Sequence, residues 1–120
     1  MRLQEVCLIT DDVLALAKFY EKVLRTTSEG NEIHTVIKIE GVSFTIYSRK
    51  AAKEDMSLCF NKGETNITLG FHVDDVDAEY VRVKALGVEI LTKPTTHPWG
   101  SRSMQFKDID GTVITFACRL

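Results

Sequence analysis

Apolar and polar residues follow one another in an order that predicts a strand and then an amphipathic helix near the start of the chain. Glu5–Thr10 is rich in apolar and β-favouring residues, and Asp11 or Asp12 is placed to cap the helix that follows. The apolar residues of this helix recur at helical spacing and predict one buried stripe: Val13, Leu16, Ala17, Tyr20, Val23 and Leu24.

Two more strands are predicted in the first half. The helix gives way to Thr26-Thr27-Ser28 and a turn-like segment, Glu29-Gly30-Asn31. Residues 33–39 and 42–48 are then predicted as strands joined by a short turn at Glu40-Gly41. The polar segment 49–64 is predicted to connect this half of the chain to the next.

The second half repeats the same order of elements. Residues 67–73 are predicted as a strand, and Asp74 or Asp75 is placed to cap a second helix that stops at Gly87. A strand at 88–92 and a hairpin of 102–107 with 112–118 complete the half. The predicted buried stripe of the second helix is Val76, Tyr80, Val83 and Leu86.

This repetition predicts an α+β fold of two tandem βαβββ modules. The strand-to-helix junction Leu8-Ile9-Thr10-Asp11-Asp12 matches Phe71-His72-Val73-Asp74-Asp75. We therefore predict a single domain over residues 1–120, with the first module at 1–49, a connection at 50–64 and the second module at 65–120.

Alternation along the predicted strands gives each sheet two unlike faces. The first face is apolar throughout and is predicted to pack under the helices: Val6, Leu8, Phe44, Ile46, Ile67, Leu69, Phe71, Ile114 and Phe116. The second face mixes small, hydroxylic and amphipathic side chains: Glu5, Cys7, Ile9, Ser43, Thr45, Tyr47, Thr68, Gly70, His72, Val113, Thr115 and Ala117. Such a mixture favours the lining of a cavity that holds an organic molecule, and an exposed sheet face is the alternative.

Composition narrows the class of protein. The chain has 120 residues, 44% of them hydrophobic, and a net charge of −2. Lysine and arginine are scattered among acids, so no nucleic-acid partner is expected. Acidic residues interrupt the N-terminal sequence before any long apolar run, so neither a signal peptide nor a membrane span is expected. Three cysteines, Cys7, Cys59 and Cys118, lack metal-finger spacing and favour reduced thiols in a cytoplasmic protein.

The segment from Pro98 to Phe116, PWGSRSMQFKDIDGTVITF, combines an aromatic loop, a strand, an acidic turn and a second strand. Together with the two strand-Asp-Asp-helix junctions and DDVDAEYVRVKALGVEI, it resembles the vicinal-oxygen-chelate superfamily of glyoxalase, fosfomycin-resistance and bleomycin-resistance proteins. The resemblance covers nearly the whole chain. It implies a cup-shaped mixed sheet with helices on the convex face and a homodimer that shares its cups.

The resemblance also implies where a metal would bind. Metal-dependent members place ligands at the start of the first strand and in the last strand of each module, which correspond here to Glu5, Thr45, Thr68 and Thr115. Neutral threonine hydroxyls are poor substitutes for imidazole or carboxylate ligands. We therefore expect no metal, no other cofactor and no catalytic residue, as in the metal-free bleomycin-resistance proteins that the chain resembles.

Three further side chains have two interpretations each. Trp99, the only tryptophan, is either a stacking wall for a ring-bearing ligand or a residue that packs in its loop or at a dimer contact. Arg102 either binds an anionic group of a ligand or pairs with Asp108, Asp110 or Glu5. Among the three histidines, His97 is the best candidate for a ligand contact or proton transfer, and a solvated or hydrogen-bonded role is its other interpretation.

The favoured function is metal-free sequestration of an aromatic or amphipathic small molecule in a cleft. One alternative is a lyase or isomerase of the glyoxalase kind that uses a metal or acid–base chemistry by Glu5. A second alternative is a structural or regulatory dimer with a closed, filled cup. The predicted ligand-binding residues are Glu5, Thr45, Tyr47, Thr68, His97, Trp99, Arg102 and Thr115.

Overall fold

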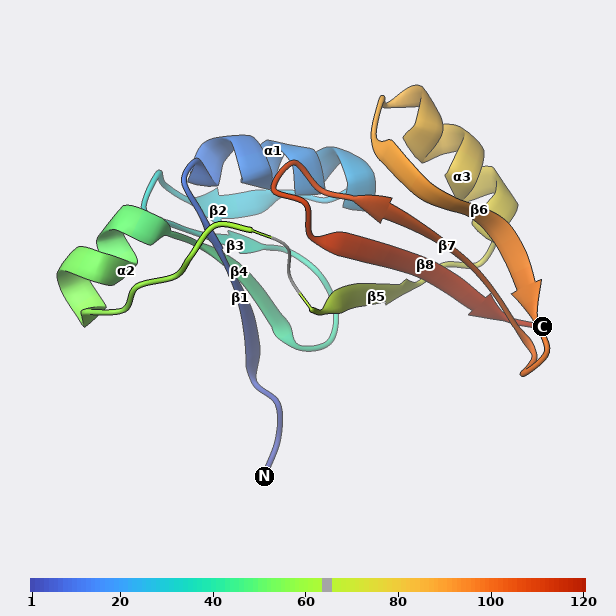
Figure 1. The fold of residues 1–120 in the computed structure, drawn as a ribbon, viewed down its shortest axis with the longest axis horizontal. Coiled ribbons are helices and arrows are strands. Elements are labelled where there is room, and N and C mark those ends of the chain that lie inside the picture. Colours follow the sequence, from blue (N-terminus) through green and yellow to red (C-terminus); the bar gives the residue numbers. More distant parts are fainter. Residues whose placement is uncertain (64–65) are drawn as a thin grey trace. The chain divides into compact units, whose positions relative to one another are not determined.

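Two compact units follow each other along the chain, residues Met1–Lys62 and Gly63–Leu120. The structure is a computed structural model that describes residues 1–63 and 66–120 (Figure 1). Glu64 and Thr65, at which the predicted connection ends and the predicted second module begins, lie outside the described residues. Each unit contains a four-stranded mixed sheet and a helix between its first and second strands, which confirms the α+β fold of two βαβββ-like modules.

The first unit contains β1 (Glu5–Thr10), α1 (Val13–Leu24), β2 (Ser28–Gly30), β3 (His34–Ile37), β4 (Ser43–Ser48) and α2 (Arg49–Met56). The strand order is β1-β4-β3-β2, with β1 parallel to β4 and the other pairs antiparallel. Parallel pairing of β1 with β4 needs a crossover, which the intervening α1, β2 and β3 provide.

Helix α1 begins and ends as its sequence predicts. The Asp12 side chain accepts a hydrogen bond from the Ala15 amide, at 3.0 Å, which satisfies one of the free N–H groups of the first turn. The predicted stripe is buried except at Leu24, which is half-buried: Val13, Leu16, Ala17, Tyr20 and Val23. The helix packs on β3 and β4, so its stripe forms the core of this unit.

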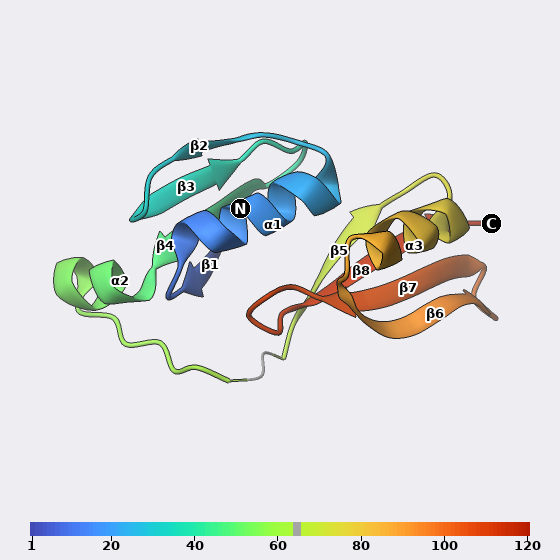
Figure 2. The same ribbon diagram turned by 90° about the horizontal axis from the view of Figure 1, so that it is seen from above.

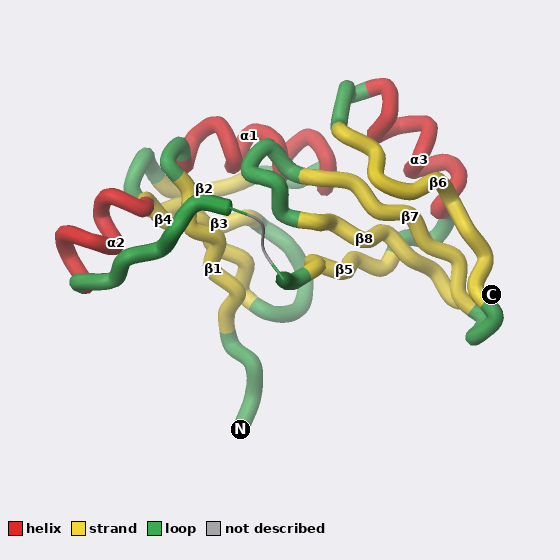
Figure 3. Tube along the Cα trace, viewed as in Figure 1, coloured by secondary structure: helices red, strands yellow, loops and turns green. Residues whose placement is uncertain are grey.

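Two elements of the first unit were not predicted. Ser28–Gly30, interpreted as part of a turn, is the short edge strand β2 and pairs with β3. Arg49–Met56, predicted only as a polar connection, is helix α2 (Figure 3). Its signal was Ser48, whose side chain accepts a hydrogen bond from the Ala51 amide at the helix start. Residues 57–63 form neither helix nor strand.

The second unit contains β5 (Thr68–His72), α3 (Val76–Ala85), β6 (Glu89–His97), β7 (Ser101–Lys107) and β8 (Val113–Arg119). The strand order is β5-β8-β7-β6, with β5 parallel to β8 and the other two pairs antiparallel. In Figure 2, α3 lies over its own sheet, and it packs on β6, β7 and β8.

Helix α3 is less buried than predicted. Asp75 caps it and Gly87, with a φ of +83°, follows its end, as the sequence indicated. Val76 and Val83 are buried, but Tyr80 is half-buried and Leu86 is 47% exposed. Leu86 lies beyond the last full turn, where the stripe no longer faces the sheet.

Strand β6 extends five residues beyond the predicted end at 92. Pro94 lies inside it, and the pairing with β7 shifts register between Ile90 and Thr92 and again between Thr92 and Thr95. An edge strand tolerates a proline because one side of its backbone needs no partner.

The predicted acidic turn joins β7 to β8. One carboxylate oxygen of Asp108 accepts hydrogen bonds from the amides of Asp110, at 2.8 Å, and Thr112, at 2.9 Å. Gly111 follows with a φ of +90°, a conformation that favours glycine. The carboxylate thus holds the turn within its own loop.

Register confirms the two predicted faces of each sheet. Val6 pairs with Phe44 and Leu8 with Ile46, while Phe71 pairs with Phe116, so these side chains share the face on which a helix packs. We call this the apolar face and the opposite one the mixed face. One predicted member of the apolar face is wrong: Ile67 precedes β5 and is 53% exposed. No helix within the described residues has the length and apolar character to span a bilayer.

Candidate functional site

The mixed face of the first unit carries one carboxylate in contact with a hydroxyl. Glu5 begins β1, and the Thr45 hydroxyl of β4 donates a hydrogen bond to its Oε1 at 2.8 Å. Thr45 is buried and Glu5 is exposed at the strand start. The contact joins two of the predicted ligand-binding residues and leaves the second carboxylate oxygen of Glu5 as a possible acceptor.

Tyr47, on the same face, is tied to helix α2. Its hydroxyl lies 3.4 Å from Oδ2 of Asp55, and its ring is tilted against that of His34, with centroids 5.8 Å apart. Partial burial raises the pKa of the Tyr47 hydroxyl, and the neighbouring Asp55 carboxylate raises it further. The phenol is therefore a neutral hydrogen-bonding group at physiological pH.

The mixed face of the second unit carries a chain of hydrogen-bonded side chains that crosses four strands. Thr68 and Thr115 share a hydrogen bond of 2.7 Å between their hydroxyls. The Gln105 amide nitrogen lies 3.4 Å from the Thr115 hydroxyl and 3.5 Å from that of Ser103. Thr92, in β6, bonds to both the amide backbone and the side chain of Gln105. We call Thr68, Thr115, Gln105, Thr92 and Ser103 the hydroxyl network.

Gln105 and Ser103 were missed in the sequence, although a signal was present. Both alternate with the buried Met104 and Phe106, and the predicted hairpin pairs Gln105 with Thr115. Counting back from the acidic turn would have assigned them to the mixed face.

His97 and Trp99 form a stacked pair at the end of β6. Their ring centroids are 4.4 Å apart and the planes differ by 2°. His97 Nε2 lies 2.7 Å from the Ser103 hydroxyl, so the imidazole is anchored to the hydroxyl network. Trp99 is 75% exposed. The stack therefore presents a flat aromatic surface, and the hydrogen bond between His97 and Ser103 fixes its orientation.

Arg102 lies away from these groups. It alternates with Ser103 along β7, so it belongs to the face that carries Met104 and Phe106. Its guanidinium donates two hydrogen bonds to Asp77 of α3, at 2.7 and 2.8 Å, and one to Thr96. This partner differs from Asp108, Asp110 and Glu5. The hydrogen bonds from Arg102 lower the pKa of Asp77, and Asp77 raises that of Arg102.

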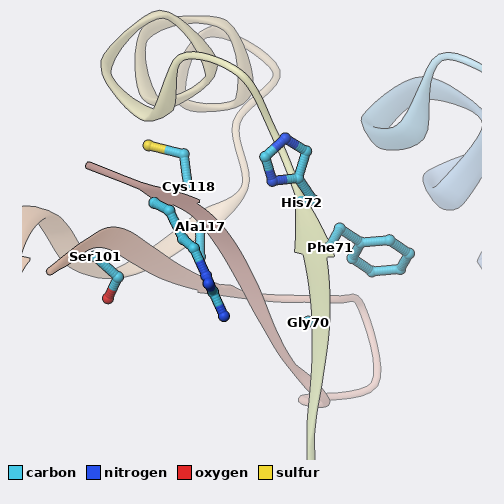
Figure 4. A pocket seen from close by; sticks show the side chains of 7 residues that line it. Gly70, Phe71, His72, Ser101, Ala117 and Cys118 are labelled. Carbon is cyan, nitrogen blue, oxygen red and sulfur yellow. The ribbon is translucent and has the colours of Figure 1, made fainter. Parts of the chain in front are cut away.

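A pocket of about 280 Å³ opens at the end of β5 and β8. Figure 4 shows its side chains, with the ring of Phe71 pointing away from Ser101 and Ala117. The lining is Gly70, Phe71, His72, Ser101, Ala117, Cys118 and Arg119. Register assigns Gly70, His72, Ser101, Ala117 and Arg119 to the mixed face. Gly70, His72 and Ala117 are predicted members of that face, whereas Ser101 and Arg119 were not predicted.

The structure thus brings the predicted residues into separate groups. Glu5 meets Thr45 in the first unit, with Tyr47 on the same face. In the second unit, Thr68 meets Thr115, and His97 meets Trp99. Arg102 contacts none of them within the described residues.

The four positions at which the resemblance implies metal ligands carry side chains that are unsuited to bind a metal here. They carry one carboxylate and three hydroxyls. These groups already hydrogen-bond to one another, Glu5 to Thr45 and Thr68 to Thr115. Neutral hydroxyls compete poorly with water for transition metals. Among residues 1–63 and 66–120, no group of three or more His, Cys, Asp or Glu side chains is placed to hold a metal ion.

Two βαβββ-like modules with mixed four-stranded sheets define the class of protein. The sequence matches the Glyoxalase/Bleomycin resistance protein/Dioxygenase superfamily over residues 2–116, and the chain belongs to this family. No curated protein matches it.

Solved structures share the fold at low sequence identity. A glyoxalase/bleomycin resistance protein/dioxygenase family enzyme from Burkholderia phytofirmans PsJN superposes with a TM-score of 0.86 at 18% identity, covering 100% of both chains. A glyoxalase/bleomycin resistance protein/dioxygenase from Nocardioides gives 0.85 at 20% identity, covering 100% of this chain and 84% of the other. A lactoylglutathione lyase from Agrobacterium tumefaciens gives 0.78 at 19%, covering 97% and 92%. These likenesses establish the fold.

Proposed function

We propose that this protein binds and sequesters a small aromatic or amphipathic molecule on the mixed faces of its sheets without a metal ion. The hydroxyl network carries the proposal. Thr68, Thr115 and Gln105 offer both donors and acceptors on a face that is linked through Ser103 and His97 to the exposed Trp99. Aromatic surface beside a few fixed polar groups is typical of sites that recognise organic ligands.

The donor set supports binding over metal-assisted chemistry. A lyase or isomerase that polarises its substrate with a metal needs carboxylate or imidazole ligands, and three of the four positions offer hydroxyls. A hydroxyl network orients polar groups of a ligand but supplies no strong acid or base near neutral pH.

Metal analysis and ligand binding test the proposal together. Untagged protein is expected to contain less than one transition metal per chain, and aromatic amphiphiles are expected to quench Trp99 fluorescence in a saturable manner. Stoichiometric Zn, Ni, Mn or Fe bound through Glu5 would refute the metal-free proposal. Catalytic turnover that disappears in Glu5→Gln, while ligand binding persists, would favour the lyase or isomerase instead.

We also propose that the protein is a homodimer. Each sheet ends in two edge strands, β1 and β2 in the first unit and β5 and β6 in the second. Edge strands present unpaired backbone groups that a second copy is able to cover. Sedimentation at micromolar concentration is expected to give twice the chain mass of 13.5 kDa. A monomer with intact secondary structure would contradict this.

A further inference from the structure

Gly70 is the one glycine among the described residues whose backbone conformation is also open to other residue types. The other six have positive φ values between 83° and 147°, which favour glycine, whereas Gly70 lies in β5 with an ordinary strand conformation. A Cβ built at Gly70 meets no atom within 4 Å, so no close neighbour excludes a side chain either. A glycine inside a strand weakens it and often marks a place where a ligand approaches the backbone.

The space above Gly70 belongs to the β5–β8 pocket. Ala117, the strand neighbour of His72, extends this floor with another small side chain (Figure 4). The volume of about 280 Å³ is just below the range of roughly 300–1,000 Å³ that is typical of small-molecule sites. The pocket is therefore suited to a compact molecule rather than to a peptide or a protein surface.

Arg119 gives the pocket its charge. Among the arginines in described helices and strands, Arg49, Arg82 and Arg102 each pair with a carboxylate of this chain. The Arg119 side chain has no hydrogen-bond or ion-pair partner among the described residues, and it lines the pocket beside Ser101, its cross-strand neighbour. A guanidinium presents parallel donors that match a carboxylate.

Three further polar groups lie at or beside the rim of the pocket: His72, Asp74 and Ser101. His72 faces the pocket from β5, and its Nε2 lies 3.3 Å from Asp74, whose side chain is fully exposed. Asp74 is the acidic group that opposes an anion on this side. Ser101 adds a hydroxyl on the other side of the pocket.

We propose that the β5–β8 pocket binds a small planar carboxylate. Arg119 receives the carboxylate, and the planar body of the ligand lies over Gly70 and Ala117. The inference rests on the proposed small-molecule binding and adds to it the charge of the ligand and the place where it binds.

Three matched probes test the charge of the ligand: 2-naphthoate, 2-naphthamide and 2-naphthylmethylamine. Each is titrated into the ¹⁵N-labelled full chain, and amide shifts of Gly70 and Ala117 report the site. We expect 2-naphthoate to bind at least about tenfold more tightly than the amide and the amine, because a charged hydrogen-bonded pair contributes about that factor. Arg119→Gln is expected to remove this preference. Asp74→Asn is expected to tighten naphthoate binding slightly, by about twofold.

Gly70→Val separates a binding role from a structural one. Valine favours strands and meets no clash, so the variant is expected to melt at a higher temperature while losing naphthoate binding. Lys107→Gln is the matched control for Arg119→Gln, because it removes a positive charge from the same sheet face at the other end of β7. It is expected to leave naphthoate binding unchanged.

Each other outcome overturns a defined part of the inference. Equal binding of naphthoate and naphthamide, with loss of both in Gly70→Val, would refute the carboxylate while leaving small-molecule binding in place. Naphthoate binding that survives Gly70→Val would show that naphthoate does not bind in the β5–β8 pocket. Absence of any shift up to millimolar concentration would refute the inference for this pocket, while fluorescence titration of other amphiphiles decides the proposed function separately.

Discussion

The two units have the same strand order but carry different chemistry on their mixed faces. At the start of the first strand, one unit has Glu5 and the other Thr68, while the last strand offers a threonine in both, Thr45 and Thr115. The first pair holds a carboxylate, and the second extends through Gln105 into a network of neutral groups. Repetition of a fold therefore fixes where side chains lie without fixing what they do.

The helices differ as well. Helix α1 buries five apolar side chains, whereas α3 buries only Val76 and Val83. Tyr20 is fully buried in the first unit and packs edge-on against Phe19 and Phe44, with centroids 5.4 and 4.9 Å away. The first unit thus relies more on its helix, and the second more on its hairpin. The following experiments test this contrast between the units.

The largest expected effect is loss of stability in Tyr20→Ala. Removal of a fully buried aromatic side chain costs about 3–5 kcal/mol. Val83 occupies the same place in α3, eight residues after the capping aspartate, and Val83→Ala is expected to cost less, about 1–3 kcal/mol. Urea unfolding measures both. Equal costs would show that the two helices contribute alike.

The next effect concerns affinity rather than stability. Trp99→Ala is expected to weaken binding of 2-naphthoate by about 2 kcal/mol, some thirtyfold, if the stacked surface adds contact beyond the pocket. Because Trp99 is 75% exposed, stability is expected to fall by no more than about 1 kcal/mol. Phe60→Ala, at an exposed aromatic of the first unit, is the control and is expected to leave calorimetric affinity unchanged. Unchanged affinity in Trp99→Ala would assign the ring to packing on His97 alone.

A smaller effect is expected within the hydroxyl network. Thr115→Val removes the hydroxyl that joins Thr68 to Gln105 and is expected to cost about 1 kcal/mol. Thr68→Val in the same background is expected to add little, because the shared bond is already gone. Thermal unfolding of the two single variants and the double variant measures this coupling. Additive costs would mean that the network does not act as a unit.

The smallest expected effect is a loss of folding stability at low pH. Hydrogen bonds from Lys62 and Arg49 lower the pKa of Asp11 in the first unit, as those from Arg102 do for Asp77 in the second. A lowered pKa adds stability above the ordinary value of 3.8, and this stability is lost as pH falls through the folded pKa. Carboxyl NMR titration is expected to place both groups below 3.8. Asp11→Asn and Asp77→Asn are expected to differ from wild type less at pH 2 than at pH 6.

Most of the fold was predictable because its signals are local. Asp12 and Asp75 cap helices at the expected places, and alternation assigned the two sheet faces correctly. Strand β2 escaped prediction because three residues around Gly30 are indistinguishable from a turn without their partner β3. Leu86 was predicted to be buried because helical spacing alone does not show at which residue the helix ends.

The candidate site was less predictable because it depends on pairing between distant strands. The partner of Arg102 illustrates this: the sequence suggested Asp108, Asp110 or Glu5, whereas the actual partner, Asp77, comes from helix α3 on the same face. The pocket was missed for the same reason, since Ser101 and Arg119 meet only through the register of β7 and β8. Alternation places Gly70 on the mixed face, but its ordinary strand backbone and empty surroundings, which make it unusual, are visible only in the structure.

The carboxylate of Asp108 has a consequence for how the second unit folds. Its bonds to Asp110 and Thr112 close the β7–β8 turn with contacts between near neighbours, so the hairpin needs little chain entropy to form. Pairing of β5 with β8 joins Thr68 to Val113, which lies much farther along the chain, so closing this longer loop costs more chain entropy. We expect Asp108→Ala to slow refolding and Leu69→Ala mainly to speed unfolding, as stopped-flow kinetics would reveal. The hairpin would then be the nucleus on which the rest of the unit assembles.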